Sequence, residues 1–221
     1  MSEPIEDGIF REINEELRQE NFAKLWKQYG SFVIAGALAL IIGVGGYQGW
    51  HAYDLKSRET QSENYAAAVN AAQAGDVGAA LEKLNTLYAD GDRGYRLLSA
   101  FYNAGLQAKK GDNKAALSAY DRIAGDGDFD NIYRDLARLL AATVEMNTGN
   151  GDKDLLTRLQ PLVDAANPWR HSARELMALM VERGGDKNKS RDLFKSLSED
   201  ASAPQSIRQR AGEMVAALGG Q

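Results

Sequence analysis

The residue types that most often bind metals or act in catalysis are scarce in this sequence. It contains two histidines, His51 and His171, and no cysteine. A zinc site needs three or four imidazole, thiolate or carboxylate ligands, often in a His-Glu-x-x-His pattern, and no such pattern occurs. The absence of cysteine also excludes disulfide bonds and thiolate sites. We therefore expect no metal site.

Three aspartates alternate as they do in calcium loops: Asp126, Asp128 and Asp130. A calcium loop is closed by a bidentate glutamate downstream. Arg138 and Leu139 stand in that region of the chain, so the closing ligand is missing. The pattern favours a solvated acidic turn over a calcium site.

Two motifs that could carry catalysis are excluded by their context. The glycine-rich stretch 43–46 (GVGG) lies inside an apolar segment, where it cannot be a phosphate-binding loop. No serine has the nucleophile-elbow pattern of a hydrolase. We predict that the protein is not an enzyme and uses no cofactor and no small-molecule substrate. An enzyme remains an alternative, which turnover of generic ester, peptide and phosphate substrates would test.

The net charge of −5 argues against nucleic acid as a partner, because phosphate binding needs a basic face. Only four prolines occur among many alanines and leucines, and no alternating β-branched stretch is visible. Helix should therefore dominate.

An apolar segment is the first element that the sequence predicts. No Asp, Glu, Lys or Arg occurs from Gln28 to Tyr53, and the apolar centre at 30–50 has 21 residues. As a helix it would be roughly 31 Å long, close to the thickness of a hydrocarbon core. Aromatic residues flank it on both sides, as they do in spanning helices. We predict one transmembrane helix over residues 30–50. A buried core helix and a cleaved signal peptide are the alternatives.

The basic residues around this segment predict its orientation. Four of them precede it and two follow it closely: Arg11, Arg18, Lys24 and Lys27, then Lys56 and Arg58. This bias favours a cytoplasmic N-terminus. In residues 1–29, Ile9, Ile13 and Leu17 share one helical face. The segment is either a short cytoplasmic amphipathic helix that touches a partner or the membrane surface, or a frayed tail.

Small residues within the apolar segment recur every four positions: Ala35, Ala39 and Gly43. Such a strip lets two helix backbones approach closely in lipid. It predicts packing against a partner helix. The alternative is that glycine and alanine are simply common in membrane helices.

A Gly-Asp step recurs four times in the rest of the chain. The steps Gly75-Asp76, Gly111-Asp112, Gly151-Asp152 and Gly185-Asp186 are 36, 40 and 34 residues apart. This spacing is close to the 34-residue tetratricopeptide period. In each unit, Gly would end one helix in a left-handed conformation and Asp would cap the next. We predict an all-α chain, with a tetratricopeptide-like solenoid of about four helical hairpins plus a capping helix over residues 54–221.

The residues after each step predict how the hairpins pack. Five residues after the Gly, a small residue would let the paired helices approach; nine after it, a large residue would fill the next layer. These positions hold Ala80, Ala116, Leu156 and Ser190, then Leu84, Tyr120, Gln160 and Phe194. Pro161 falls inside a predicted helix (152–166) and should break it. Further residues assigned to the core are Tyr95, Leu98, Tyr102 and Leu106, and Phe129, Ile132, Leu136, Leu139 and Leu140.

Three stretches resemble the YfgM-like family of Gram-negative bacteria, in particular its alphaproteobacterial members. They are residues 11–18 (REINEELR), 25–30 (LWKQYG) and 167–173 (NPWRHSA). The resemblance implies an ancillary subunit of the SecYEG translocon in the bacterial inner membrane. It also implies a periplasmic repeat domain that helps to hand secreted proteins to chaperones, and no catalytic residues.

Both the repeats and the resemblance predict a protein-binding function. Its partners would be translocon subunits, periplasmic chaperones or client proteins, with basic or apolar segments favoured by the excess of acidic residues. The concave face of the first helices would bind them, and we assign four contact residues there: Tyr65, Asn103, Gln107 and Arg134. A structural scaffold for envelope assembly or cell division is the alternative function.

Overall fold

A computed structural model describes residues 4–148 and 152–219, with side chains for Arg18 and from residue 22 on, except 152–154. The secondary-structure elements of these residues are helices joined by turns, and no strand occurs among them. The chain divides into two compact units, one up to Glu59 and one from Thr60 on. The predicted all-α fold is confirmed.

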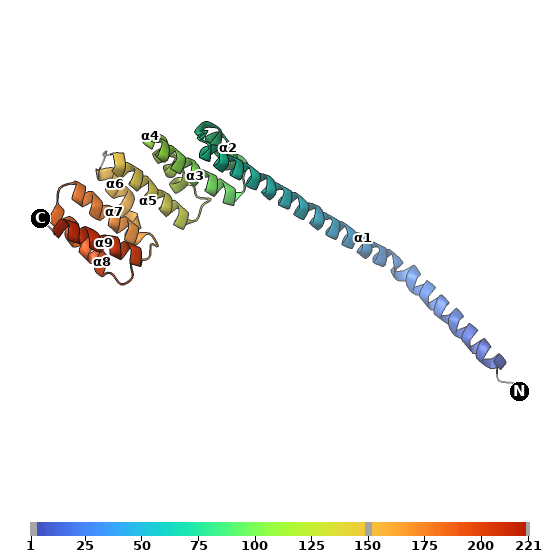
Figure 1. Cartoon of the computed structure of the whole chain (residues 1–221). Coiled ribbons are helices and arrows are strands. Elements are labelled where there is room, and N and C mark those ends of the chain that lie inside the picture. Colours follow the sequence, from blue (N-terminus) through green and yellow to red (C-terminus); the bar gives the residue numbers. More distant parts are fainter. Residues whose placement is uncertain (1–3, 149–151, 220–221) are drawn as a thin grey trace. The chain divides into compact units, whose positions relative to one another are not determined.

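The first helix, α1 (Pro4–Gln73), is continuous from the N-terminal segment through the apolar segment into the first repeat (Figure 1). The large side chains of residues 30–50 are exposed, among them Phe32, Leu40 and Ile42. A buried core helix is therefore not what the structure shows. Of the helices described, this one is long and apolar enough to cross a membrane. The side chains of Ile9, Ile13 and Leu17 lie outside the described part.

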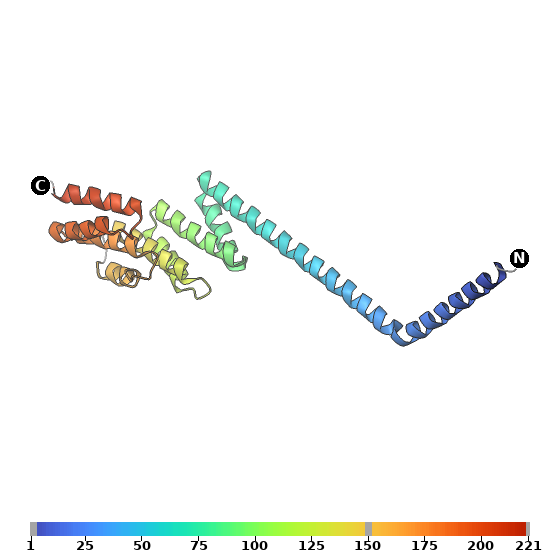
Figure 2. The same ribbon diagram turned by 90° about the horizontal axis from the view of Figure 1, so that it is seen from below.

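The repeat unit consists of the end of α1 and eight further α-helices within the described residues. Successive hairpins follow one another in chain order from α2 to α9, as Figures 1 and 2 show from two directions. The helices are α2 (Val77–Asp90), α3 (Arg93–Lys110), α4 (Asn113–Gly125), α5 (Asn131–Thr148), α6 (Asp152–Leu159), α7 (Arg170–Arg183), α8 (Lys187–Glu199) and α9 (Gln205–Gly219). A 3-10 turn, η1 (Gln160–Leu162), follows α6.

The Gly-Asp step forms the same turn wherever it is described in full. Gly75, Gly111 and Gly185 have φ angles of 86°, 86° and 90°, in the left-handed region that only glycine adopts without strain. The amide of the following Asp donates to the carbonyl five residues earlier, which closes a Schellman motif. The Asp carboxylate then accepts from the amide three residues later and caps the second helix. Gly151 lies outside the described residues.

The third unit departs from this pattern. Helix α6 begins at Asp152 itself, whereas α2, α4 and α8 begin one residue after their capping Asp. The packing register therefore moves by one residue: Leu155 and Leu159 are buried, and Leu156 and Gln160 are exposed, contrary to the prediction. Pro161 falls in η1, and the α-helix stops at Leu159, as the missing amide of proline requires.

The core is built from small residues at helix crossings and larger ones between them. Ala104, Ala142 and Ala178 occupy equivalent positions in α3, α5 and α7 and are fully buried. Ser190, also buried, donates its hydroxyl hydrogen bond to the Ala178 carbonyl at 2.9 Å. The prediction of a core position is wrong for two residues: Leu98 is 50% exposed and Ile132 is 43% exposed.

Replacing Ala116 with phenylalanine should destabilise the repeat unit by about 1–3 kcal/mol, because a fully buried methyl position has no room for a ring. Chemical denaturation of the whole protein measures this loss. Ser118, exposed on the same helix, supplies the control, and Ser118→Phe should change stability little. Equal midpoints for the two variants would contradict the predicted packing.

Candidate protein-binding surface

Side-chain contacts in the repeat unit connect residues about one repeat apart. Arg93 bonds to Asp130 at 2.8 Å, 37 residues away, and Arg210 forms a two-pronged ion pair with Glu175, 35 residues away. This pattern is expected of a stack in which each repeat contacts its neighbours. Residues at equivalent positions of successive repeats therefore form continuous columns on the surface.

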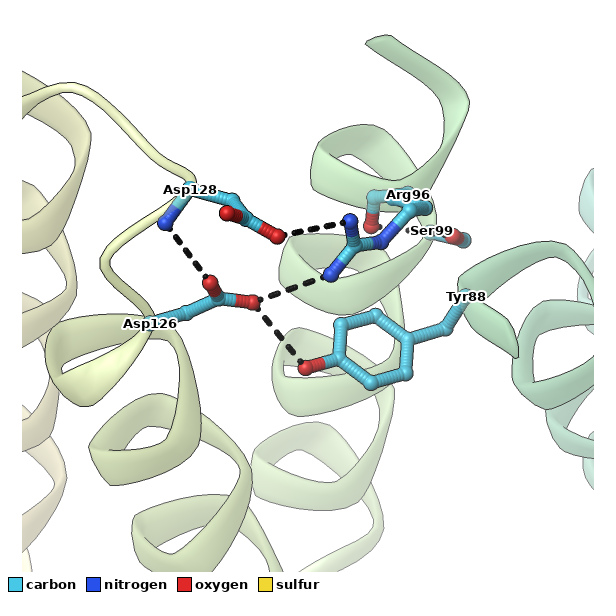
Figure 3. A network of polar contacts seen from close by, with 5 residues as sticks. All are labelled: Tyr88, Arg96, Ser99, Asp126 and Asp128. Atoms are coloured by element: carbon cyan, nitrogen blue, oxygen red, sulfur yellow. Dashed lines mark hydrogen bonds and ion pairs between the residues drawn. The ribbon is translucent and has the colours of Figure 1, made fainter. Parts of the chain in front are cut away.

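The predicted acidic turn is neutralised from the preceding repeat (Figure 3). Arg96 donates to Asp126 and to Asp128, both at 3.2 Å, and the Tyr88 hydroxyl lies 3.4 Å from Asp126. The hydrogen bond to Asp128 is the largest cause that raises the pKa of Arg96. The Asp126 side chain is mostly buried, so the prediction of a solvated turn is wrong for this residue, whereas Asp128 and Asp130 are exposed. In the described part of the chain, no group of three His, Cys, Asp or Glu residues could hold a metal ion.

The four predicted contact residues have different surroundings. The Tyr65 ring lies 6.2 Å from that of Tyr95 and 6.1 Å from that of Tyr102, and burial raises the pKa of its hydroxyl. Asn103 is only 7% exposed and donates to Asn85 Oδ1 at 2.9 Å, on the side of α3 that faces α2 and α4.

Gln107 lies away from the exposed apolar residue of its helix. At 3.6 residues per turn, Gln107 is about 180° around α3 from Leu98. The Arg134 Nε atom is buried and has no hydrogen-bond partner among the described residues. The structure does not bring the four residues into one cluster, and their binding of a partner stays a prediction.

A set of exposed and half-buried residues lies on the first helices, and the sequence analysis assigned three of them, Tyr95, Leu98 and Ile132, to the core. Tyr95, Tyr133 and Trp169 occupy equivalent positions at the starts of α3, α5 and α7, spaced 38 and 36 residues apart. The Trp169 ring nitrogen donates to the Ile132 carbonyl at 2.9 Å and thereby fixes the ring between two repeats. We define Tyr95, Leu98, Ile132, Tyr133 and Trp169 as the first-helix surface. The aromatic spacing was a signal available in the sequence.

The strip of small residues in α1 is open along its length. Ala35, Ala39 and Gly43 are exposed, and a Cβ atom added at Gly43 would meet nothing within 4 Å. A partner helix could therefore approach here closely. That it does so stays a prediction.

His171 is a buried titratable group at the start of α7. It is 4% exposed, its Nδ1 atom lies 3.6 Å from Asp200 Oδ2, and its Nε2 atom lies 3.5 Å from the Ser202 hydroxyl. Burial is the largest cause that lowers its pKa, and Arg170 and Arg174 lower it further. The neutral imidazole is therefore the favoured form in the folded protein.

The stability of the repeat unit should fall as the pH falls below about 6.5, where the unfolded histidine gains a proton that the folded one resists. The pKa of Asp200 is also lowered, chiefly by the Ser202 hydroxyl, but that contribution is lost only at more acidic pH, below about 4. Melting temperatures between pH 7.5 and 5.5 measure the effect. His171→Gln should flatten the dependence of the melting temperature on pH. The same dependence in the variant and the wild type would contradict the role of His171.

One family model matches most of the chain. It is described as a tetratricopeptide repeat-like domain and matches residues 23–216, a range that includes the apolar segment as well as the repeats. No curated protein and no solved structure matches this chain.

Proposed function

We propose that this chain, which belongs to the tetratricopeptide repeat-like domain family, is a module that binds other proteins at a membrane. The observation that carries the proposal is the first-helix surface of the helical stack, where Leu98, Ile132 and Tyr133 are exposed beside the half-buried Tyr95 and Trp169. Apolar side chains that remain exposed in a folded repeat unit mark an interaction surface. Aromatic residues are enriched where proteins bind each other.

The membrane part of the proposal rests on α1. Its apolar residues are exposed, and lipid would cover them. A helix forms its backbone hydrogen bonds within itself, so none would be left unmade in the bilayer. Residues 30–50 would span the bilayer, residues 1–29 would lie in the cytoplasm, and residues 54–221 would form the repeat domain. The resemblance to the YfgM-like family supports an inner-membrane location and a periplasmic repeat domain.

The same resemblance supports a finer role as an ancillary subunit of the protein translocon. The repeat domain would then receive secreted proteins, or bind the periplasmic chaperones that receive them. The exposed apolar side chains of the first-helix surface suit such partners, because unfolded secreted proteins present apolar segments.

Co-purification from membranes in a gentle detergent tests this role. Translocon subunits should accompany the wild type, and Tyr133→Ser should reduce their recovery. Lys114→Ala, at an exposed site on the second helix α4, is the matched control and should recover them fully. Recovery of division or outer-membrane assembly proteins instead would contradict the translocon role and favour a structural scaffold.

The orientation has a separate test. Alkaline phosphatase fused after Gln221 should be active in intact cells, because the excess of Lys and Arg before residue 30 favours a cytoplasmic N-terminus. A cytoplasmic reporter fused at the same point should be inactive. The reverse result would show that the repeat domain faces the cytoplasm.

A further inference from the structure

The second helices of successive hairpins leave three gaps at equivalent places in the stack. The gap between α2 and α4 lies over α3, the gap between α4 and α6 lies over α5, and the gap between α6 and α8 lies over α7. The volumes of these gaps are about 10, 510 and 450 Å³. The first gap is therefore closed, and the other two are open.

An aromatic side chain of the protein itself helps to close the first gap. Tyr88 of α2 lines it, together with Asn85 and Asn103, which are hydrogen-bonded to each other. The guanidinium groups of Arg122 and Arg96 lie 5.3 and 5.7 Å from the centre of the Tyr88 ring. A space between two successive second helices can therefore hold a large aromatic ring with cations near it.

The second gap is open but charged. Arg158 of α6 crosses it to reach Asp121 of α4 and Glu145 of α5. An apolar side chain entering here would have to displace these ion pairs.

The third gap is open and apolar. Tyr88 follows Gly75 by thirteen residues, and the corresponding position after Gly151, corrected for the shifted register of α6, is Val163. Val163 lies beyond Pro161, where the α-helix has already stopped, and this position therefore has no aromatic ring. Met177 of α7 also lines this gap, at the position equivalent to Asn103 of α3.

The walls of the third gap are also apolar. Leu156 of α6 and Leu193 of α8 are 38% and 39% exposed, although leucine side chains gain free energy when they are covered. Lys189 lies on the rim and forms no ion pair in the described part of the chain, whereas Arg174 is 3.5 Å from Asp200. The rim thus offers one uncompensated positive charge.

We propose that this third gap, lined by Leu156, Val163, Met177 and Leu193, is a docking groove for a segment of another polypeptide. The segment inserts an aromatic or large aliphatic side chain, as Tyr88 does in the first gap, and carries an acidic residue beside it that pairs with Lys189. The volume is within the range of ligand pockets, and the flexible Met177 adapts to different anchors. The proposal rests on the proposed protein-binding function and adds a site on the second helices, separate from the first-helix surface.

Two labelled ten-residue peptides test the groove on the full-length protein in lipid nanodiscs. One has a central Phe-Leu pair flanked by glutamates, and the other has alanines in place of the pair. Fluorescence anisotropy should show at least roughly tenfold tighter binding of the Phe-Leu peptide, the size expected for one buried large side chain. Leu193→Asp should abolish this preference, and Lys189→Glu should weaken binding of the glutamate-flanked peptide.

Val163→Tyr is the second variant and does not introduce a buried charge. It restores a ring at the position of Tyr88 and should block the peptide. Equal affinity for both peptides, or binding that survives both Leu193→Asp and Val163→Tyr, would overturn the groove. Tyr133→Ser should leave peptide binding unchanged. If no peptide binds while Tyr133→Ser still reduces partner recovery, the groove is wrong and the proposed function stands.

Discussion

Replacing Leu38 and Ile42 together with arginine is expected to remove the protein from the membrane fraction. Both residues lie near the centre of the apolar segment and are exposed on α1. On the insertion scale, exchanging two aliphatic residues for arginine at a helix centre costs roughly 6–8 kcal/mol. A penalty of this size strongly disfavours insertion of the segment into the bilayer.

Carbonate extraction of membranes measures the result. The wild type should stay in the pellet, and the double arginine variant should appear in the supernatant or be degraded. Leu38→Val with Ile42→Val keeps the apolar character and is the matched control, which should stay in the pellet. A double arginine variant that resists extraction would mean that α1 is not the anchor.

Replacing Phe194 with alanine should lower the free energy of unfolding of the repeat unit by about 3–5 kcal/mol. Phe194 is 1% exposed and packs in α8 against Leu197, Ile207 and neighbouring alanines of α7 and α9. Removing the ring leaves a cavity, which would be filled only if α7, α8 and α9 moved closer together. The loss should be visible in urea denaturation followed by circular dichroism.

The adjacent leucine provides the control for this prediction. Leu193 is on the same helix but is partly exposed, so Leu193→Ala should cost less than about 1 kcal/mol. If both alanine variants unfold at the same urea concentration, α8 does not pack with the face that the structure shows.

Features that depend on local chemistry could be predicted from the sequence. The Gly-Asp step specifies both a left-handed glycine and an N-cap, so it located the hairpins without any knowledge of their packing. The end of α6 was predictable for the same reason, because Pro161 acts on its own helix. The apolar segment was predictable from length and charge alone.

Features that depend on helix phase could not be predicted in the same way. Leu98 and Ile132 look like core residues by type, yet the stack buries Ser99 and Ala100 beside Leu98, and Ala137 further along α5. A phase error of one residue rotates a helix by about 100°, which exchanges surface for core. The predicted contact residue Asn103 is likewise mostly buried, and its side chain donates to Asn85.

Contacts between repeats were also beyond the sequence analysis. The pairing of Arg96 with Asp126 joins residues 30 positions apart, and nothing local to either one indicates the other. The contrast among the three gaps has the same origin. Whether a gap is closed, charged or apolar depends on which side chain of one repeat contacts the next repeat.

Site-specific photo-crosslinking in intact cells tests the central claim, that the first-helix surface binds other proteins at a membrane. A photoreactive phenylalanine analogue is placed at Tyr133, with Lys114 as the exposed control on α4. Irradiation should give a discrete protein adduct from position 133 and none from position 114, and the adduct should disappear in the double arginine variant of α1. No adduct at position 133, or the same adducts from both positions, would contradict the account.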